Sequence, residues 1–368
     1  MSELGCSDFL RVLGLSLYGP LAASHRVRLS QFQPGLLSLG IDLQIQSLLD
    51  DAYLQRSFSG RRASLRSLFA AYVRRVQILC QTDQYDLAIV YGDLLPYLPS
   101  WLECRLLRIP FIYDCDDAFF LKYSTGRLRL FQSLIGSKAN RLMSSAVAVT
   151  AGNDWLAANA RLSNSNVTLL PSVVDTEHYR PVEFSRLESR AEPFTLGWIG
   201  SPSTAPYLKL LVDPLQQLAC ERSVRLIVVG GAAPTIKGVD VIELPWSLEQ
   251  EVPMIQQFHV GVMPLPDTSW ARGKCAYKLI QCMACGIPVV ASPVGANVDV
   301  VSPECGLLAH SSDEWLMSLR YLAVDADRRL QMGISARQRV EQRYSLRNAL
   351  PLLKSVIKQA VPSRHHNS

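Results

Sequence analysis

The C-terminal half of this chain contains the segment Trp270-Ala-Arg-Gly-Lys-Cys-Ala-Tyr-Lys-Leu-Ile-Gln-Cys-Met-Ala-Cys-Gly-Ile-Pro-Val-Val-Ala-Ser-Pro-Val-Gly295. A polar loop runs into a helical pattern, whose apolar positions are Tyr277, Leu279, Ile280, Met283 and Ala284. Gly286 ends this helix, because glycine readily adopts the left-handed conformation that follows a helix. Residues 287–291 then read as a short buried strand, and residues 292–297 as a turn-rich loop. The segment therefore predicts a helix–strand unit of an α/β fold.

The loop before this helix is a candidate anion site. It carries Arg272, Gly273 and Lys274, and so delivers two cations and backbone N–H groups to the N-terminus of a helix. This arrangement suits a phosphate, because unpaired N–H groups and the helix dipole both favour negative charge. Lys278 and Gln281 lie about one turn apart on one helical face, so both can reach a ligand lying along the helix.

Residues 279–292, Leu-Ile-Gln-Cys-Met-Ala-Cys-Gly-Ile-Pro-Val-Val-Ala-Ser, resemble the donor-binding region of GT-B glycosyltransferases of family 4, the group 1 type of bacterial surface-polysaccharide pathways. That family usually shows Glu-Gly, a few residues, and then Glu-Ala-Met-Ala-Cys-Gly-x-Pro-Val-Val-Ala-Ser. Its first glutamate falls here on Gly273 and its second on Gln281. A glutamine can still exchange hydrogen bonds with a ribose, whereas a mechanism centred on the first carboxylate loses support.

The resemblance implies an α/β fold of two facing Rossmann-like, doubly wound parallel-sheet domains, with a C-terminal helix that crosses back to the N-terminal domain. It also implies transfer of a hexose or related sugar from a nucleotide-diphosphate sugar to a glycan or lipid-linked acceptor, with retention of anomeric configuration. We expect Arg272 and Lys274 to neutralise the departing diphosphate. The expected donor-binding residues are Gly200, Ser201, Lys278, Gln281 and Asn297.

Length and composition agree with two domains. A chain of 368 residues is too long for one ordinary core, and a hydrophobic fraction of 48% supplies two. We place the domains at residues 1–185 and 186–344, followed by a crossover helix and tail at 345–368, because a charged, unpatterned run marks the boundary. The net charge of +5 is too small and scattered to indicate nucleic-acid binding. Nine irregularly spaced cysteines indicate a reduced, cytoplasmic protein.

In the N-terminal half, buried-strand patterns alternate with helical ones, which predicts a parallel sheet of six strands. The first strand, residues 9–17, leads into a loop at Gly19 and a helix that contains Arg26 and Arg28. Gly19 allows a ligand to approach the backbone, and Arg26 offers it a charge. For Arg28 we expect a solvated side chain.

An acidic motif, Asp114-Cys-Asp-Asp-Ala118, follows one of these strands. Asp116 and Asp117 are candidates for positioning the acceptor or serving as a catalytic base, because similar polysaccharide enzymes carry Asp-x-Asp-Asp-Ala at the end of an N-domain strand. The structural alternative is that Asp117 caps a helix. A lone Asp-x-Asp could also hold a divalent metal, but no His, Cys or carboxylate cluster has convincing ligand spacing. We therefore expect no metal and no cofactor apart from the nucleotide-sugar donor.

A second series of strands and helices begins at residues 195–200. Gly200 and Ser201 precede a predicted helix through Leu208 and Leu215, whose N-terminus we expect to face a phosphate. The sequence Gly-Ser-Pro-Ser is not the glycine fingerprint of a dinucleotide-binding protein.

Residues 59–79 read as an amphipathic helix with five arginines and no compensating acid: Arg61, Arg62, Arg66, Arg74 and Arg75. Such a helix can lie on the anionic inner membrane, and the alternative is a domain helix with a solvated face. The sequence shows no secretory signal and no run of about 18 apolar residues. We expect a cytoplasmic protein that rests on the inner membrane through this helix.

Two rival functions stay open at this point. A non-hydrolysing nucleotide-sugar epimerase shares the two-domain architecture but releases no nucleotide. A catalytically silent partner subunit is the second rival, since both family carboxylates are replaced here; it would bind nucleotide without transferring sugar.

Overall fold

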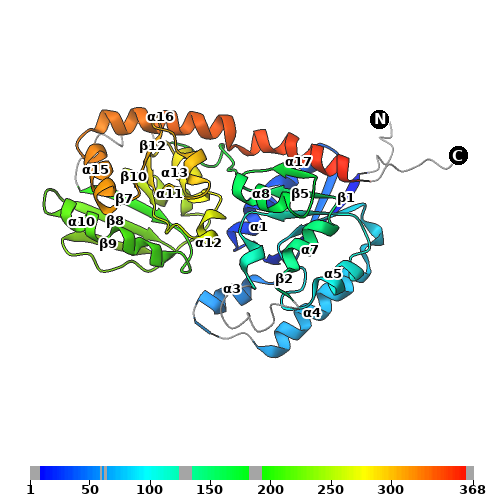
Figure 1. The fold of residues 1–368 in the computed structure, drawn as a ribbon. Helices are drawn as coiled ribbons and strands as arrows, with labels where there is room; N and C mark the ends of the chain where they lie inside the picture. Colours follow the sequence, from blue (N-terminus) through cyan, green and yellow to red (C-terminus); the bar gives the residue numbers. More distant parts are fainter. Residues whose placement is uncertain (1–8, 59, 62–63, 124–134, 182–192, 362–368) are drawn as a thin grey trace, which may run out of the picture. The chain divides into compact units, whose positions relative to one another are not determined.

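A computed structural model describes residues 9–58, 60–61, 64–123, 135–181 and 193–361. The chain divides into two compact units: unit 1 comprises residues 1–172 and 349–368, and unit 2 comprises residues 173–348. Each unit holds a parallel six-stranded sheet with helices packed against it (Figure 1). The predicted α/β fold of two Rossmann-like parallel-sheet domains is confirmed.

Unit 1 has the strand order β2-β1-β3-β4-β5-β6. Its strands are β1 (Leu10–Tyr18), β2 (Ile41–Leu49), β3 (Leu87–Tyr91), β4 (Phe111–Cys115), β5 (Ala148–Ala151) and β6 (Val167–Leu169). Its helices are α1 (Ala23–Arg28), α2 (Gln33–Ser38), α3 (Asp51–Phe58), α4 (Leu65–Cys80), α5 (Ser100–Leu106), α7 (Lys138–Ser145) and α8 (Asp154–Arg161), with short 3-10 segments η1 (Ser30–Phe32), η2 (Thr82–Gln84) and η3 (Phe119–Leu121).

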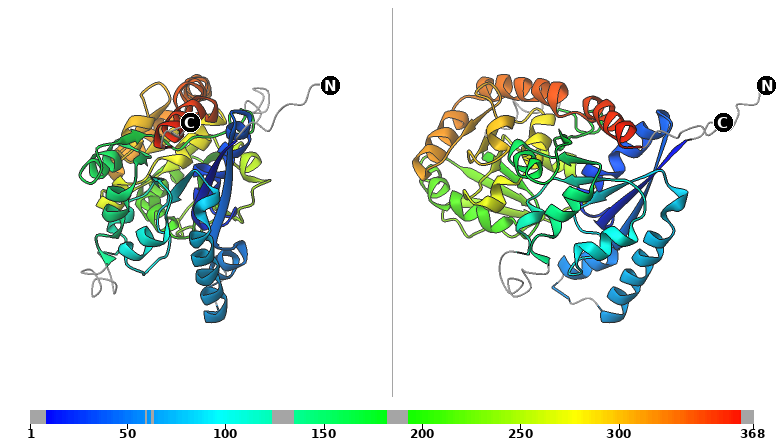
Figure 2. Two further views of the ribbon diagram at one scale, coloured as in Figure 1. Left: turned by 90° about the vertical axis from the view of Figure 1, so that its right-hand side faces the viewer. Right: turned by 45° about the vertical axis from the view of Figure 1, so that its right-hand side comes forward.

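The sheet of unit 1 forms because its central strands are apolar on both faces. Every residue of β3 and of β4 is buried, the pattern expected where helices cover both sides of a parallel sheet. Figure 2 shows the long strands β1 and β2 side by side in blue, and their register pairs Leu10 with Ile41 and Tyr18 with Leu49. The carboxyl ends of β1, β3 and β4 therefore lie at one edge of the sheet.

Unit 2 has the strand order β12-β11-β10-β7-β8-β9. Its strands are β7 (Phe194–Ile199), β8 (Val224–Val229), β9 (Val239–Leu244), β10 (Val260–Met263), β11 (Val289–Ala291) and β12 (Gly306–Leu308). Its helices are α10 (Val212–Ala219), α11 (Glu251–Ile255), α12 (Ser269–Arg272), α13 (Tyr277–Ala284), α14 (Asn297–Val300), α15 (Ser312–Ala323) and α16 (Ala326–Arg343), with the 3-10 segment η5 (Ala205–Leu211).

Two hydrophobic clusters cover the faces of this second sheet. Along β7, Trp198 joins the cluster formed with α10 and α15, while the next residue, Ile199, joins the cluster formed with α13 and α16. Successive strand residues point to opposite faces, so both clusters draw on the same strands. Strands β9 and β12 escaped the sequence analysis. β9 is an edge strand interrupted by Asp240 and Glu243, and β12 is only three residues long.

The C-terminal helix α17 (Leu346–Ala360) follows α16 and packs on unit 1, to which residues from Ala349 onward belong (Figure 1). Gly35 of α2 lies against it, since a Cβ placed on Gly35 would come within 2.5 Å of Leu350 Cδ2. The predicted return of the last helix to the N-terminal domain is confirmed.

Candidate functional site

The strand order of unit 2 identifies where a ligand can bind. From β7 the chain adds β8 and β9 on one side, and then returns to add β10, β11 and β12 on the other. Ligands of doubly wound sheets bind beyond the carboxyl ends of the strands at such a reversal. Here those ends are followed by Gly200, after β7, and by Pro264, after β10.

Lys278, in the first turn of α13, reaches this position. Its ammonium nitrogen donates a hydrogen bond to Thr204 Oγ1 at 2.9 Å and lies 4.5 Å from the ring centre of Trp198. A Cβ on Gly200 would be 2.5 Å from Lys278 Cε and 2.7 Å from Trp198 Cη2, so the lack of a side chain at Gly200 lets both residues come close to this loop. Burial, together with the nearby charge of Lys274, lowers the pKa of Lys278 to about 7.

The charge of Lys278 has no acidic partner among the described residues. Its only charged neighbour that affects its pKa is another cation, Lys274. A buried cation without a counter-charge is costly, and a phosphate supplied by a ligand would remove that cost. The loop of Gly200 and the side chain of Lys278 are therefore a candidate anion site.

The segment after Gly200 differs from the expected helix. Residues 205–211 form the 3-10 segment η5, and the α-helix α10 begins only at Val212. The helix predicted through Leu208 and Leu215 is thus present as a 3-10 segment that continues into an α-helix, and the approach of its N-terminus to a phosphate stays a prediction. Ser201 is exposed, and its hydroxyl lies 2.8 Å from that of Ser203. The hydroxyl of Thr204, which directly precedes η5, lies next to Lys278.

Arg272 and Lys274 lie before α13, but their surroundings differ. Arg272 ends the short helix α12 and makes two hydrogen bonds to Asp267, at 2.7 and 3.0 Å, on the exposed surface. Lys274 is half-buried, with its ammonium nitrogen 5.2 Å from the ring centre of Trp270. An exposed ion pair contributes little stability and exchanges easily. Lys278 thus has no acidic partner among the described residues, whereas Arg272 is paired with Asp267.

Gln281 and Asn297 are both buried beside this region. Gln281 donates hydrogen bonds to Glu251 Oε1 at 2.6 Å and to the hydroxyl of Tyr179 at 2.9 Å. Asn297 donates to the carbonyl of Ser292 at 2.9 Å, and its buried Oδ1 has no hydrogen-bond partner among the residues that the structure describes. Glu251 was not identified from the sequence, because nothing in its neighbourhood along the chain marks it.

In unit 1, Gly19 and Arg26 shape the loop after β1. A Cβ on Gly19 would be 2.6 Å from Asp51 Oδ1, which accepts a hydrogen bond from the backbone of Leu21 at 3.0 Å. Arg26 donates to the carbonyls of Pro20 and Leu21, both at 2.8 Å. Both predicted residues thus participate in closing this loop.

Arg28 is buried, so the expectation of a solvated side chain is wrong. It makes two hydrogen bonds to Asp114, through Nε at 2.8 Å and Nη2 at 2.5 Å, and a third to the carbonyl of Leu170. Thr150 also donates to Asp114. The ion pair joins α1 to the centre of the sheet, which no local pattern could reveal. The first aspartate of the Asp-x-Asp motif is therefore committed to structure, and the described residues contain no cluster of three metal-ligating side chains.

Asp116 and Asp117 follow β4 at the same sheet edge, and both are partly exposed. Asp116 accepts a hydrogen bond from the phenol of Tyr91 at 2.5 Å. Burial raises the pKa of Asp116 to about 6, against the opposing effects of Arg28 and Tyr91. Asp117 accepts a local bond from the backbone of Ala118, and no side-chain hydrogen bond caps η3. The helix-capping alternative is therefore wrong for the described residues.

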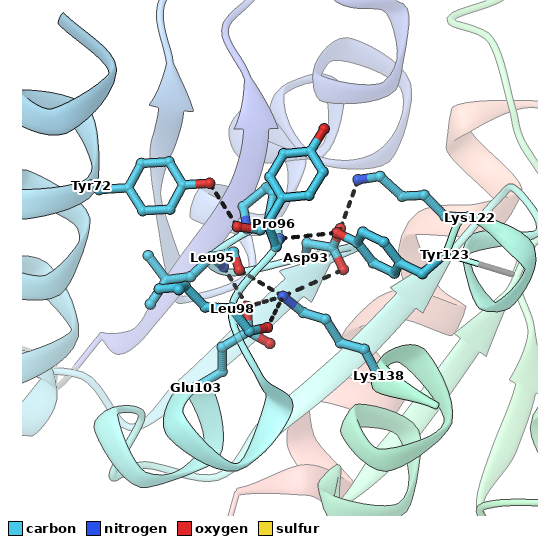
Figure 3. Close-up of polar contacts among 10 residues, drawn as sticks. Tyr72, Asp93, Leu95, Pro96, Leu98, Glu103, Lys122, Tyr123 and Lys138 are labelled. Carbon is cyan, nitrogen blue, oxygen red and sulfur yellow. Dashed lines mark hydrogen bonds and ion pairs between the residues drawn. The ribbon is translucent and has the colours of Figure 1, made fainter. Parts of the chain in front are cut away.

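A buried ionic cluster supports the loop after β3 (Figure 3). Lys138, at the start of α7, is fully buried; it pairs with Glu103 at 2.8 Å and donates to the carbonyls of Leu95 and Leu98. Glu103 also accepts a hydrogen bond from the backbone of Leu95. The loop is thereby held by groups from α5 and α7. Sequence reasoning missed Lys138 because it lies 43 residues from Leu95 along the chain.

Asp93 is the other acid of this cluster (Figure 3). It accepts hydrogen bonds from Lys122 at 2.7 Å and from the hydroxyl of Tyr123 at 2.6 Å. Tyr97, in the same loop, adopts a positive φ of 65°, a strained backbone for a bulky residue. The contacts of Asp93 with Lys122 and Tyr123 thus hold this loop, which follows the strand paired with β4.

Helix α4 leaves an apolar stripe uncovered. Leu65, Phe69 and Val73 are exposed by 83%, 72% and 39%, and they recur every fourth residue along one face. Arg75 points the other way: it is buried and donates to the carbonyls of Ser16 and Gln46. Arg75 therefore does not belong to the expected row of five arginines on the polar face of this helix. Arg62 lies outside the described residues. No helix among the described residues is long and apolar enough to span a membrane.

Comparison with known proteins assigns a family to part of this geometry. Residues 193–325, which contain Gly200 and α13, match the family model of glycosyl transferases group 1. No curated protein sequence matches the chain significantly.

Solved structures with a similar fold cover nearly the whole chain. HepE of Anabaena in complex with UDP-glucose has a TM-score of 0.70 and 15% identity, covering 95% of this chain and 99% of its own. Sucrose-phosphate synthase of Thermosynechococcus elongatus has a TM-score of 0.69 and 16% identity, covering 95% and 98%. The lipopolysaccharide outer core galactosyltransferase WaaB has a TM-score of 0.60 and 13% identity, covering 95% and 99%. At these identities the likeness establishes the fold.

Proposed function

We propose that this chain, which has the GT-B fold, is a group 1 glycosyltransferase that transfers a hexose or related sugar from a nucleotide-diphosphate sugar to a glycan or lipid-linked acceptor. The proposal includes retention of anomeric configuration and a role in cell-surface polysaccharide biosynthesis. The observation that carries it is the half-buried Lys278, whose ammonium group lies against Gly200 and has no acidic partner among the described residues.

The chemistry proposed for unit 2 is stabilisation of the leaving group. When the bond between the anomeric carbon and the diphosphate oxygen breaks, negative charge accumulates on the diphosphate. Lys278, with Lys274 next to it, offers positive charge where that anion forms, in surroundings that partly exclude water. Arg272 joins them if the diphosphate displaces Asp267. Gln281 holds the ribose, and Asn297 lies beside the donor.

Asp116 of unit 1 is the residue that we propose as the acceptor-side base or orienting group. A pKa of about 6 leaves its carboxylate ionised at neutral pH and close to the range in which a base accepts a proton efficiently. Asp117, the next residue, accepts a hydrogen bond from the backbone of Ala118 and is the second choice.

The nucleotide that we propose is a uridine diphosphate, because structures of similar fold were determined with UDP-glucose and with UDP. No metal and no further cofactor is included in the proposal. The commitment of Asp114 to Arg28 supports this, since it removes one of the two carboxylates that a metal would need.

We also propose that the protein acts at the cytoplasmic surface of the inner membrane, with α4 as the contact. Its exposed apolar stripe, residues 65, 69 and 73, is accompanied by the exposed arginines Arg66 and Arg74. Apolar area and positive charge on one helix suit an anionic lipid surface, where a lipid-linked acceptor would be found.

The experiment that tests the function begins with a panel of nucleotide sugars and thermal unfolding of the purified protein. A stabilising donor is then supplied with lipid-linked glycans, and released nucleotide and product configuration are measured with and without excess chelator. We expect acceptor-dependent release that survives chelation, and a product that retains configuration. Nucleotide release without an acceptor product would contradict sugar transfer. No stabilisation by any nucleotide sugar would contradict the proposed donor. Activity restored only by manganese or magnesium would contradict a reaction without metal.

A further inference from the structure

Glu251, the first residue of α11, is a buried carboxylate with an unusual set of partners. It is only 3% exposed, and it accepts hydrogen bonds from the phenol of Tyr179, the indole of Trp246 and the amide of Gln281. No Lys, Arg or His pairs with it among the described residues. Three neutral donors from separate parts of unit 2 thus solvate one buried charge.

These bonds fix the orientation of the Gln281 amide. A carboxylate has no proton to donate, so Gln281 must turn its NH₂ group toward Glu251. The hydroxyl of Tyr179 donates to Glu251 and accepts the other amide hydrogen of Gln281 at 2.9 Å. Both hydrogens are therefore used inside the cluster. The group that Gln281 keeps for a ligand is its carbonyl oxygen, a hydrogen-bond acceptor.

The same carboxylate holds Trp246 next to the anion site. A Cβ placed on Gly230 would lie 3.1 Å from Trp246 Cβ and 2.4 Å from the carbonyl oxygen of Gly200. Trp246 therefore stands beside the loop that Lys278 contacts, and the bond from its indole to Glu251 limits its rotation. Glu251 thus orients the side chains of Gln281 and Trp246 near the carboxyl ends of β7 and β10, where the strand order reverses.

We propose that Glu251 is a positioning residue for the donor nucleotide. Through its hydrogen bonds Glu251 keeps the carbonyl oxygen of Gln281 available to accept a hydrogen bond from a ribose hydroxyl. A glutamate at position 281 would accept this bond directly with its own carboxylate. This inference rests on the proposed function, because it takes the ribose of a nucleotide sugar as the group that Gln281 recognises.

The test compares the affinities of uridine diphosphate and 2′,3′-dideoxyuridine diphosphate by calorimetry. The parent should prefer the ribose form by about tenfold, the effect of one good hydrogen bond. In Glu251→Gln the amide of Gln281 is free to flip, so the preference should fall to threefold or less. Glu249→Gln, the same change at an exposed site two residues earlier, should keep the parental preference.

A reciprocal exchange distinguishes positioning from general damage. Gln281→Glu alone places two carboxylates in contact and should lose the preference. The double variant Glu251→Gln with Gln281→Glu restores an amide–carboxylate pair and should recover it, even if the single variants are less stable. Parental discrimination in Glu251→Gln, or no recovery in the double variant, overturns the inference while leaving the proposed function intact. A parent that binds neither nucleotide contradicts the proposed function itself, and this inference with it.

Discussion

At the scale of single residues, Lys278 governs the expected pH dependence of donor binding. Burial and the charge of Lys274 lower the pKa of Lys278 to about 7. Below pH 7 the free protein already carries the charge that a diphosphate needs. Above pH 7 binding must be accompanied by proton uptake, so the affinity should decrease as the pH rises.

We predict that UDP affinity falls by up to about tenfold per pH unit between pH 7 and 9, and that Lys278→Met binds at least about tenfold more weakly with a flatter profile. Calorimetry in buffers of different ionisation enthalpy measures both the affinity and the proton uptake. Lys209→Met, at an exposed position, is the matched control. Equal pH slopes for the parent and Lys278→Met would remove Lys278 from the donor site.

Asp116 sets the second expectation at this scale. A base must be deprotonated, so turnover should be lost as the pH falls through about 6, the pKa to which burial raises this carboxyl. Asp116→Asn should lower turnover by about 10²–10⁴-fold if the carboxylate is the base, with donor affinity nearly unchanged. Asp117→Asn serves as the comparison.

Tyr91→Phe provides an independent check on Asp116. The hydrogen bond from Tyr91 lowers the pKa of Asp116, so its removal should shift the acid limb of the rate profile to higher pH. If Asp116→Asn and Asp117→Asn both turn over at the parental rate, neither aspartate is the base. The phosphate of the departing nucleotide would then be the base.

At the scale of elements, the junction of α5, α7 and the loop after β3 depends on Lys138. Lys138→Met leaves Glu103 buried without its partner, which should lower the free energy of unfolding by about 3–5 kcal/mol. Urea unfolding measures this loss. Lys122→Met breaks an ion pair whose lysine is 28% exposed and should cost at most about 1 kcal/mol. Similar losses for the two variants would show that Lys138 is not the centre of the cluster.

Helix α4 leads to a prediction about lipid. Phe69→Glu removes exposed apolar area and adds a negative charge, which anionic headgroups repel. Binding to phosphatidylglycerol vesicles should therefore weaken by about tenfold or more. Co-sedimentation measures the effect. Met317→Glu, on an exposed face of α15 in unit 2, should bind vesicles as the parent does. If the Phe69 variant also binds like the parent, α4 is a solvated domain helix.

At the scale of the whole molecule, both sheets follow from buried runs such as residues 87–91 and from their alternation with helical patterns. Parallel strands covered on both faces need such runs, and the connecting helices need their 3.6-residue period. Edge strands lack the constraint of two covered faces. For this reason β9, with Asp240 and Glu243, escaped recognition.

The return of the last helix was expected only from the family resemblance. The sequence by itself determined most strands of the two parallel sheets and the segment that carries Lys278. It could do so because these features depend on periodicity and local turns. Only the tertiary structure decided that Arg28 is buried against Asp114, 86 residues away, and that Gln281 meets Glu251, 30 residues away. Such partners are chosen when strands and helices pack, because a buried charge must find its counterpart across elements rather than along the chain.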